Sequence, residues 1–146
     1  MILRRASASD ADACAAILND WIDQTPWMPR IHSPADVTRH YRQTVLPKRD
    51  VRVAGDPPQG FIAIDDTDGL VTALYVAATA RGGGLGTRLI ADAKRRHGHL
   101  RLWTFAANSR ARRFYRGQGF EEVDRTDGEN EENLPDILLT WPGHAR

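Results

Sequence analysis

The chain has 146 residues, of which 41% are apolar and 27% are charged. That length suits one domain of about 100 to 150 residues, and that composition excludes a largely disordered chain. Twenty basic side chains against nineteen acidic ones give a formal net charge of +1, which argues against a general nucleic-acid or anionic-membrane binder. We therefore expect a single domain over residues 1–146, in which any charge effect is local.

The sequence shows no targeting or metal-binding pattern. No apolar run approaches the roughly 18 to 20 residues that a membrane span needs, and the start MILRRASASD lacks the features of a signal peptide. We therefore expect a cytoplasmic protein without a membrane partner. Cys14 is the single cysteine and has no second thiol with which to form a disulfide or share a metal. We interpret it as a small core residue and expect no metal site.

The first half of the chain predicts a strand, two helices and three further strands. The expected elements are a strand at 2–5, a helix capped by Ser7 or Ser9, a helix from Ser33 and Pro34 that ends before Pro47, and strands at 51–54, 61–64 and 70–76. The three strands are separated by turn-forming residues, so we expect an antiparallel meander. Residues 25–33 form a loop with unusually large apolar side chains, among them Trp27.

The second half alternates helices and strands. The expected elements are a helix from Gly84 to about His97, a strand at 100–105, a helix from Asn108 to Gly119, and strands at 121–125 and 137–141. An acidic stretch, DGENEENLPD, separates the last two strands. Antiparallel strands followed by alternating helix and strand indicate an α+β fold with mixed strand pairing.

The segment RGGGLG, residues 81–86, lies between a predicted strand and a predicted helix. Glycines let the backbone approach a ligand closely, and the amides and dipole of a helix N-terminus favour an anion. Arg81 adds a permanent cation, so the segment predicts a phosphate or pyrophosphate site. A P-loop is excluded because Gly86 is followed by Thr87 rather than lysine, and the third glycine of the dinucleotide fingerprint is missing. By itself the glycine cluster could also be a flexible turn.

A second motif supports the ligand-binding interpretation. Residues 108–115, NSRARRFY, precede Gly119-Phe120, and together with LYV at 74–76 and RGGGLG they resemble the GNAT superfamily of acyl-coenzyme A N-acyltransferases. The resemblance is strong over residues 70–123 and rests on element order elsewhere. It implies a GNAT-like mixed, mainly antiparallel central sheet of about six to seven strands, flanked by helices in a three-layer α/β/α arrangement.

The resemblance also implies an activity and the residues that carry it. The activity is that of an acyltransferase, an acetyl-CoA-dependent N-acetyltransferase that passes the acetyl group to a primary amine of a small molecule by direct attack in a ternary complex. The residues that would bind acetyl-CoA are Leu74, Tyr75, Val76, Arg81, Gly82, Gly83, Gly84, Leu85, Gly86, Thr87 and Asn108. Strand 74–76 would also supply the backbone N–H that stabilises the oxyanion.

Tyr115 matches the family position of a general acid, which would protonate the leaving thiolate of coenzyme A. A phenol with a pKa of about 10 suits that step. Aromatic residues at helical spacing more often pack in a core, but Phe114 can serve the core while its neighbour points elsewhere. Asn108 can cap its helix whether or not it also contacts the cofactor.

The sequence leaves the general base open. The strand residues 72–74 carry no carboxylate where some family members keep a base. Groups that could accept a proton, directly or through water, are His32, His40, Asp127, Glu131, Glu132 and Asp136. Trp27 and His32 are the residues we expect in the acceptor site, with the acidic stretch as its other wall. An acidic wall would favour a cationic amine, although the tryptophans could be core and the acidic run could serve solubility alone.

Several alternatives remain open. One is a non-catalytic module that binds or senses coenzyme A, and another is an acetyltransferase that acts on a protein amino terminus or lysine. A nucleic-acid binder could use the basic segments KRRHGHLR and SRARRFYR, but the net charge argues against it. One or two of those basic side chains could instead meet the 3′-phosphate of the cofactor. Assembly as a homodimer is also left open.

Overall fold

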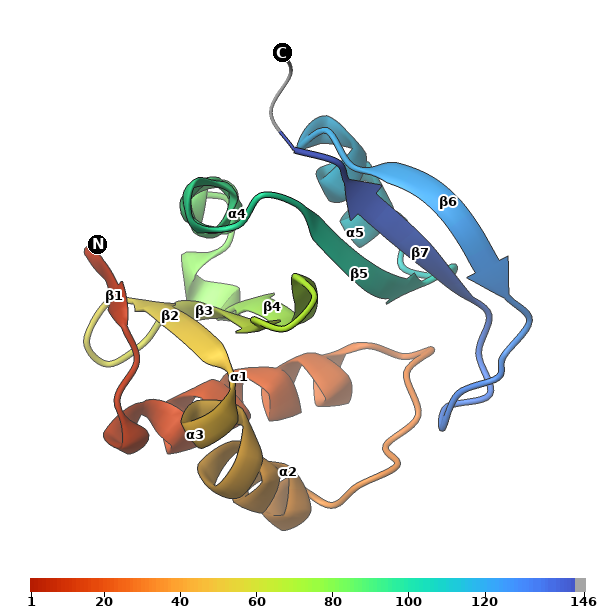
Figure 1. Cartoon of the computed structure of the whole chain (residues 1–146). Helices are drawn as coiled ribbons and strands as arrows, with labels where there is room; N and C mark the ends of the chain where they lie inside the picture. The colour runs from red at the N-terminus through yellow and green to blue at the C-terminus, as the bar shows by residue number, and fades with distance from the viewer. Residues whose placement is uncertain (144–146) are drawn as a thin grey trace.

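The computed structural model describes residues 1–143, and within them the chain builds a seven-stranded sheet (Figure 1). The strands are β1 (Leu3–Arg5), β2 (Asp50–Ala54), β3 (Gly60–Asp65), β4 (Leu70–Val76), β5 (Leu100–Phe105), β6 (Glu121–Thr126) and β7 (Asp136–Trp141). Their order across the sheet is β1-β2-β3-β4-β5-β7-β6. Neighbouring strands are antiparallel except β4 and β5, which are parallel. The expected mixed, mainly antiparallel sheet is therefore confirmed, including the meander of β2, β3 and β4.

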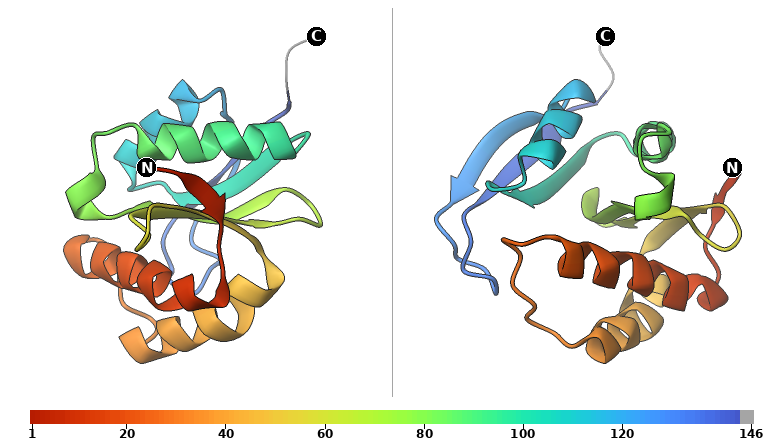
Figure 2. Two further views of the ribbon diagram at one scale, coloured as in Figure 1. Left: turned by 90° about the vertical axis from the view of Figure 1, so that its left-hand side faces the viewer. Right: turned by 180° about the vertical axis from the view of Figure 1, so that it is seen from behind.

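Helices cover both faces of this sheet (Figures 1 and 2). On one face lie α1 (Ala11–Gln24), α2 (Pro34–His40) and α3 (Leu46–Lys48), and on the other lie α4 (Leu85–Arg96) and α5 (Ser109–Gly117). The expected three-layer arrangement is confirmed. The longest of these helices, α1, has 14 residues, and no helix in the described part of the chain could cross a membrane.

Each face of the sheet packs against its own apolar core, so β3 is buried on both sides. Ile62 and Ile64 pack on the face covered by α4, whereas Phe61 and Ala63 pack on the face covered by α1. Cys14 of α1 is fully buried in the second core, as the sequence predicted. Burial raises the pKa of its thiol to about 12, which keeps the sulfur protonated and unreactive.

The second helical segment continues through Pro47, where the sequence predicted an end. Between α2 and α3 lies a π-helical turn, Tyr41–Val45, and the Leu46 N–H bonds the Tyr41 carbonyl five residues back. A proline ring has no N–H and clashes with the carbonyl four residues earlier in a regular α-helix. The wider turn changes that spacing just before Pro47, so the helical path reaches Lys48.

Strand β4 contains a β-bulge at Thr72. Ala63 pairs with Ala73 and the next residue, Ile64, pairs with Val71, so Thr72 is left out of the register. Its hydroxyl donates to the Ala63 carbonyl at 3.2 Å. The bulge interrupts the alternation of side chains between the two faces of the sheet. As a result, Val71 packs on the α4 face whereas Ala73 packs on the α1 face.

Candidate active site

Strands β4 and β5 diverge in the middle of the sheet (Figure 1). Within residues 1–143, these two parallel strands pair where Leu70 lies beside Arg101. Both residues lie at the start of their strands, so the strands diverge toward their carboxyl ends. A cleft of about 710 Å³ lies between the diverging strands. Beyond Leu70, the edge of β4 that faces this cleft is not paired with β5.

The glycine turn borders this cleft with an open backbone surface. Gly82 and Gly84 have φ values of 84° and 80°, in the left-handed region that other residues rarely adopt. A Cβ atom at either position would meet nothing within 4 Å, so both glycines face open space. Gly84 immediately precedes the first turn of α4. The turn is therefore a cradle with free backbone beside a helix N-terminus, the arrangement that suits a phosphate group.

Gly86 serves a different purpose. A Cβ atom there would lie 3.3 Å from the ring of Phe114, so the missing side chain lets α4 and α5 pack closely. Arg81 is exposed, and its Nε donates to the Val76 carbonyl at 3.2 Å, which ties the turn to the end of β4. Asn108 caps α5 by accepting from the Ala111 N–H at 3.1 Å.

The tertiary structure brings the predicted cofactor residues together. Those that line the cleft are Leu74, Tyr75, Val76, Arg81, Gly82, Gly84, Leu85, Gly86, Thr87 and Asn108. Gly83 belongs to the same turn but does not line the cleft. Residues far apart in the sequence thus share one space, because the turn follows β4 after a single 3-10 turn, Ala78–Ala80, and α5 follows β5.

Tyr115 lies in the core and at the cleft at once. It is 8% exposed, its ring contacts those of Phe114 and Phe120, and it lines the cleft. Phe114 packs against the core as expected, but the expectation that Tyr115 points elsewhere is wrong, since Tyr115 belongs to the same core and is the more buried of the two. Burial, with a smaller contribution from Tyr75, raises the pKa of the Tyr115 phenol above its usual value. The hydroxyl is therefore protonated at neutral pH, and the raised pKa makes it a weaker acid than a free phenol.

Four aromatic rings form one side of the cleft, and we call them the aromatic wall. They are Trp21 of α1, Trp27 of the 25–33 loop, Tyr75 of β4 and Phe105 of β5. Ring centroids lie 5.8 Å apart for Trp21 and Trp27, 5.4 Å for Trp21 and Tyr75, and 5.8 Å for Trp27 and Phe105. Sequence reasoning missed Phe105 as a site residue. Its position at the carboxyl end of a strand beside the glycine-turn strand was the available signal.

The two loops predicted as walls of the acceptor site contact each other through His32 and Glu131. His32 Nε2 lies 2.8 Å from Glu131 Oε2, which joins the 25–33 loop to the acidic loop at residues 127–135. The His32 side chain is 58% exposed and does not line the cleft. Its predicted place inside the acceptor site is therefore not supported, although it borders the loop that carries Trp27.

The acidic loop also acts on the aromatic wall. Burial, and after it the negative charge of Glu132, raises the pKa of Tyr75 to about 12. Glu132 itself is half-buried. The six candidate bases are His32, His40, Asp127, Glu131, Glu132 and Asp136. All six lie in the described part of the chain, and none lines the cleft. Any of them would therefore need an intervening water to deprotonate an amine bound there.

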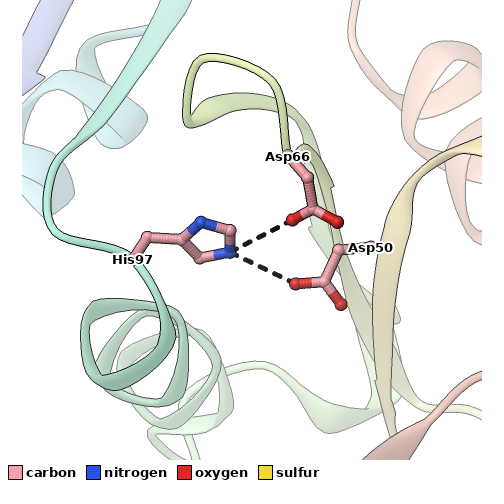
Figure 3. A group of neighbouring side chains, drawn as sticks. All are labelled: Asp50, Asp66 and His97. Carbon is pink, nitrogen blue, oxygen red and sulfur yellow. Dashed lines mark hydrogen bonds and ion pairs between the residues drawn. The ribbon is translucent and has the colours of Figure 1, made fainter.

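A cluster with metal-ligand chemistry lies elsewhere, at the opposite end of β4 from Tyr75 (Figure 3). Asp50 at the start of β2, Asp66 after β3 and His97 after α4 bring ligand atoms within 4.8 Å of one another. His97 Nε2 lies 3.2 Å from Asp50 Oδ2 and 3.7 Å from Asp66 Oδ1. These residues do not line the cleft.

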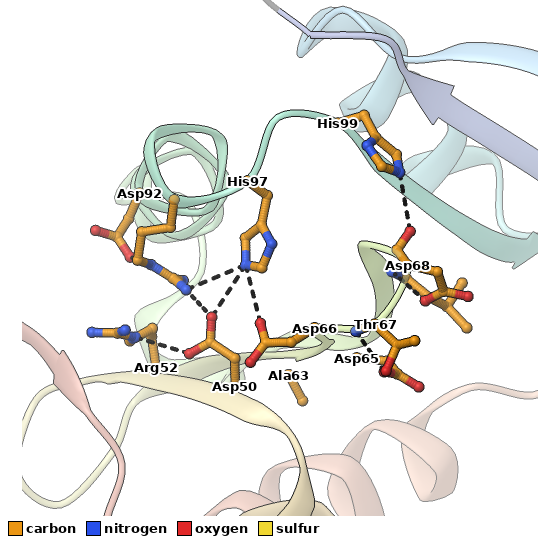
Figure 4. A network of polar contacts seen from close by, with 12 residues as sticks. Asp50, Arg52, Ala63, Asp65, Asp66, Thr67, Asp68, Asp92, His97 and His99 are labelled. Carbon is orange, nitrogen blue, oxygen red and sulfur yellow. Dashed lines mark hydrogen bonds and ion pairs between the residues drawn. The ribbon is translucent and has the colours of Figure 1, made fainter.

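Two arginines bind the central carboxylate of that cluster, which belongs to Asp50 (Figure 4). Arg52 Nε donates to Asp50 Oδ1 at 3.1 Å, and Arg96 Nη1 donates to Asp50 Oδ2. Arg96 also donates to Asp92 at 2.9 Å. Because guanidinium groups already neutralise Asp50 and would repel a metal ion, we interpret the cluster as a structural network that ties β2 to the end of α4.

Comparison with known proteins identifies the family. Residues 47–122, more than half of the chain, match the family model described as an acetyltransferase (GNAT) domain. The chain belongs to the GNAT acetyltransferase family. Consistent with this, peptidyl-lysine N-acetyltransferase YiaC of Escherichia coli K12 is 29% identical over 150 residues, which cover 97% of each protein. The chain is therefore an acyl-CoA-dependent N-acetyltransferase of the GNAT family.

Solved structures show the same GNAT fold. The solution structure of apo-form YjaB from Escherichia coli has a TM-score of 0.77 and 22% identity, covering 99% of this chain and 100% of that one. The structure of YncA from Salmonella typhimurium with its cofactor acetyl-CoA has a TM-score of 0.74 and 19% identity, covering 100% of this chain and 96% of that one. The expected GNAT-like architecture is therefore confirmed along nearly the whole chain.

Proposed function

We propose that this GNAT enzyme transfers the acetyl group of acetyl-CoA to a primary amine of a small molecule, by direct attack in a ternary complex. The observation that carries the proposal is the convergence of three features in one cleft. These are the open glycine turn, the β5-facing edge of β4 and the buried hydroxyl-bearing ring of Tyr115. The aromatic wall lines the same cleft and offers the amine a place beside the thioester.

The residues of the turn fit the donor. The space that Cβ atoms would occupy at Gly82 and Gly84 is open, and the amides that begin α4 lie next to it. The pyrophosphate of acetyl-CoA would accept hydrogen bonds from these amides, with Arg81 as a counter-charge. The unpaired edge of β4 would bind the pantetheine arm in the manner of an added strand. Acetyl-CoA supplies the activated thioester.

The chemistry follows from these positions. An alkylamine with a pKa of about 10.4 must lose a proton before it can attack. Attack forms the N–C bond and a tetrahedral oxyanion, which a backbone N–H of residues 74–76 would stabilise. The C–S bond then breaks, the electron pair leaves with sulfur, and the thiolate takes the Tyr115 hydroxyl proton. The acylated nitrogen releases its extra proton to solvent, and the Tyr115 phenolate regains a proton from solvent. The products are an N-acetyl amine and coenzyme A.

A second acceptor class, the lysine side chain of a protein, is favoured by one observation. The relative from Escherichia coli, which aligns along 97% of this chain, is named a peptidyl-lysine N-acetyltransferase. A lysine side chain presents the same primary amine as a small alkylamine, so the chemistry above would not change. The two candidates differ only in what surrounds the amine.

A two-step experiment tests the function. Acetyl-CoA at about 100 times its Kd should stabilise the folded protein by roughly 2.7 kcal/mol, which a thermal-shift titration detects. Release of free thiol is then measured with small amines, free amino acids, polyamines and lysine-containing peptides, and kcat/KM is compared. A small amine as the best acceptor supports the first proposal, and a peptide as the best acceptor supports the second. Absence of thiol release with every amine would overturn both.

A further inference from the structure

We propose that Arg30 is a positioning residue, whose guanidinium holds the 25–33 loop on α1 and thereby keeps Trp27 at the cleft where β4 and β5 diverge. The role assigned to Arg30 rests on the proposed function, because the acceptor is taken to enter the cleft beside this loop. Arg30 itself does not line the cleft and acts on it through the loop alone.

The Arg30 guanidinium ties the loop to α1 at several atoms. Its Nη2 donates to Asp23 Oδ1 at 2.9 Å and to the Asn19 carbonyl at 3.2 Å. Its Nη1 donates to Asn19 Oδ1 at 3.0 Å and to the His32 carbonyl at 3.1 Å. The Arg30 side chain is 24% exposed, so most of it is shielded from solvent. A planar guanidinium with several N–H donors suits such a divergent set of acceptors, whereas the compact ammonium of lysine does not.

The 25–33 loop depends on these contacts, because its main chain forms few hydrogen bonds of its own. It runs from the end of α1 to the start of α2 (Figures 1 and 2). Among the residues that the structure describes, one backbone hydrogen bond involves residues 26–32, from the Met28 N–H to the Thr25 carbonyl at 3.1 Å. Two prolines within this segment have no N–H to donate. Arg30 therefore supplies bonds that the main chain of the loop does not.

Trp27 is the loop residue that joins the two sides of the cleft. Its ring centroid lies 5.8 Å from that of Trp21, on α1, and 5.8 Å from that of Phe105, at the carboxyl end of β5. Beyond Leu70, strands β4 and β5 are not paired, so strand pairing does not hold these two sides together there. The place of Trp27 therefore decides how the cleft is bounded on the side of α1.

Loss of the Arg30 contacts should free Trp27. Segment 27–30 is held on α1 at both ends, by the ring contact of Trp27 with Trp21 and by the hydrogen bonds of Arg30. Without the second anchor, the ring contacts alone would oppose the conformational entropy of the loop. Trp27 would then leave Phe105 for part of the time. The cofactor cradle is built from residues 81–86 and should not change.

Fluorine NMR on protein labelled with 5-fluorotryptophan tests this role without catalysis. The chain has four tryptophans, and the variant Trp27→Phe assigns the Trp27 signal. In Arg30→Gln the Trp27 signal should move toward its position in urea-unfolded protein, whereas the signal of Trp141, which is buried in the other core, should stay in place. A Trp27 signal that does not move in Arg30→Gln would overturn the proposal.

Two further variants separate positioning from a general loss of stability. Asp23→Ala removes a largely exposed partner of Arg30, so it should fold even if Arg30→Gln does not, and should move the Trp27 signal in the same direction. Arg42→Gln is the matched control, because Arg42 also binds a carboxylate of α1, that of Asp12 at 2.6 and 2.7 Å, but lies outside the loop. An equally large movement of the Trp27 signal in Arg42→Gln would contradict the assignment.

Steady-state kinetics should show the effect on one substrate alone. In Arg30→Gln the KM for the acceptor should rise at least about fivefold with a smaller change in kcat, while the Kd for coenzyme A, measured by calorimetry, stays the same. Arg30→Lys keeps the charge but not the forked geometry, so it should resemble Arg30→Gln. Full recovery in Arg30→Lys would show that charge alone matters and would overturn the role of the fork.

The NMR measurement and the acetylation assay can fail independently. Movement of the Trp27 signal in Arg30→Gln, in a protein that acetylates no amine, would leave the role of Arg30 standing and overturn the transferase proposal. Acetylation of amines by a protein in which Arg30→Gln changes neither the Trp27 signal nor the acceptor KM would do the reverse.

Discussion

His32 Nε2 and Glu131 Oε2 lie 2.8 Å apart although 99 positions separate the residues in the sequence. Both side chains are more than half exposed, and an exposed pair contributes only roughly 0–1 kcal/mol to stability. The contact nevertheless fixes the acidic loop beside the loop that carries Trp27. We therefore expect this pair to matter for the entrance of the acceptor more than for the fold.

His32→Ala tests that expectation. Loss of the contact frees the acidic loop from the 25–33 loop, so the KM for the acceptor amine should rise severalfold while the KM for acetyl-CoA stays unchanged. The melting temperature should change by no more than about 4 °C, as for a loss of up to 1 kcal/mol. Arg39→Ala, which removes another exposed ion pair with Asp36, is the control and should leave both KM values unchanged. A rise in the acetyl-CoA KM alone would contradict the prediction.

Tyr115→Phe should lower kcat by about 10²- to 10⁴-fold, the usual range for loss of a general acid. Affinity for acetyl-CoA should stay the same because the ring and its packing against Phe114 and Phe120 are kept. Steady-state kinetics and a cofactor titration measure the two quantities. Tyr41→Phe is the matched control, since Tyr41 is also buried, also has a raised pKa and lies outside the cleft.

The pH dependence gives a second check on the same residue. Because the pKa of Tyr115 is raised above its usual value of about 10, its hydroxyl keeps its proton throughout the neutral and mildly alkaline range. The wild-type kcat should therefore not fall between about pH 7 and pH 9 through loss of this proton. Equal turnover of Tyr115→Phe and wild type would return Tyr115 to a purely structural role.

Gly84→Ala should weaken acetyl-CoA binding at least tenfold, because its Cβ would enter the open space of the cradle. The substitution also strains a backbone with φ of 80°, which costs roughly 1–2 kcal/mol. Gly119→Ala separates the two effects, since Gly119 has φ of 88° and a Cβ there would make only an ordinary contact at 3.7 Å. Both variants should lose stability, but only Gly84→Ala should lose affinity in a calorimetric titration.

His97 should make the protein less stable in mild acid. Burial, and after it the positive charge of Arg96, lowers its pKa below 6.5, although Asp66 acts in the opposite direction. In the unfolded chain the imidazole takes up its proton more readily, so the free energy of unfolding falls as pH decreases through about 6.5. His97→Gln should therefore show a smaller difference in unfolding free energy between about pH 7.5 and 5.5 in urea titrations.

His40→Gln is the control for that measurement, because His40 is exposed and lies at the end of α2, outside the network. It should keep the wild-type pH dependence. An unchanged dependence in His97→Gln would show that other groups set the acid sensitivity of the protein.

Local patterns were sufficient to predict most elements. Apolar spacing predicted the inward face of α4, where Leu85, Leu89, Ile90 and Ala93 are all buried. Asn108 and Gly119 marked the two ends of α5, since a side-chain acceptor and a left-handed glycine act within one turn of their own position. The glycine turn could also be predicted, because its left-handed backbone conformation depends on its own glycines.

Local patterns failed where the cause lies outside the segment. Pro47 predicted a helix end, but a π-helical turn one step earlier changed the hydrogen-bond spacing. His32, which was expected in the acceptor site, does not line the cleft, because the fold directs its side chain toward Glu131. The inverse holds for Phe105, an ordinary strand residue in the sequence that lies against Trp27 because β4 and β5 diverge.

By itself the sequence determined the element order, the glycine cradle and the family motifs, since each depends on residues within a few positions of one another. Only the tertiary structure decided which side chains share the cleft, that the aromatic wall joins four elements, and that Asp50 is neutralised by arginines instead of being free for a metal. The physical reason is that such contacts depend on strand divergence and loop placement. These are set by the packing of the whole sheet and leave no periodic trace in any one segment.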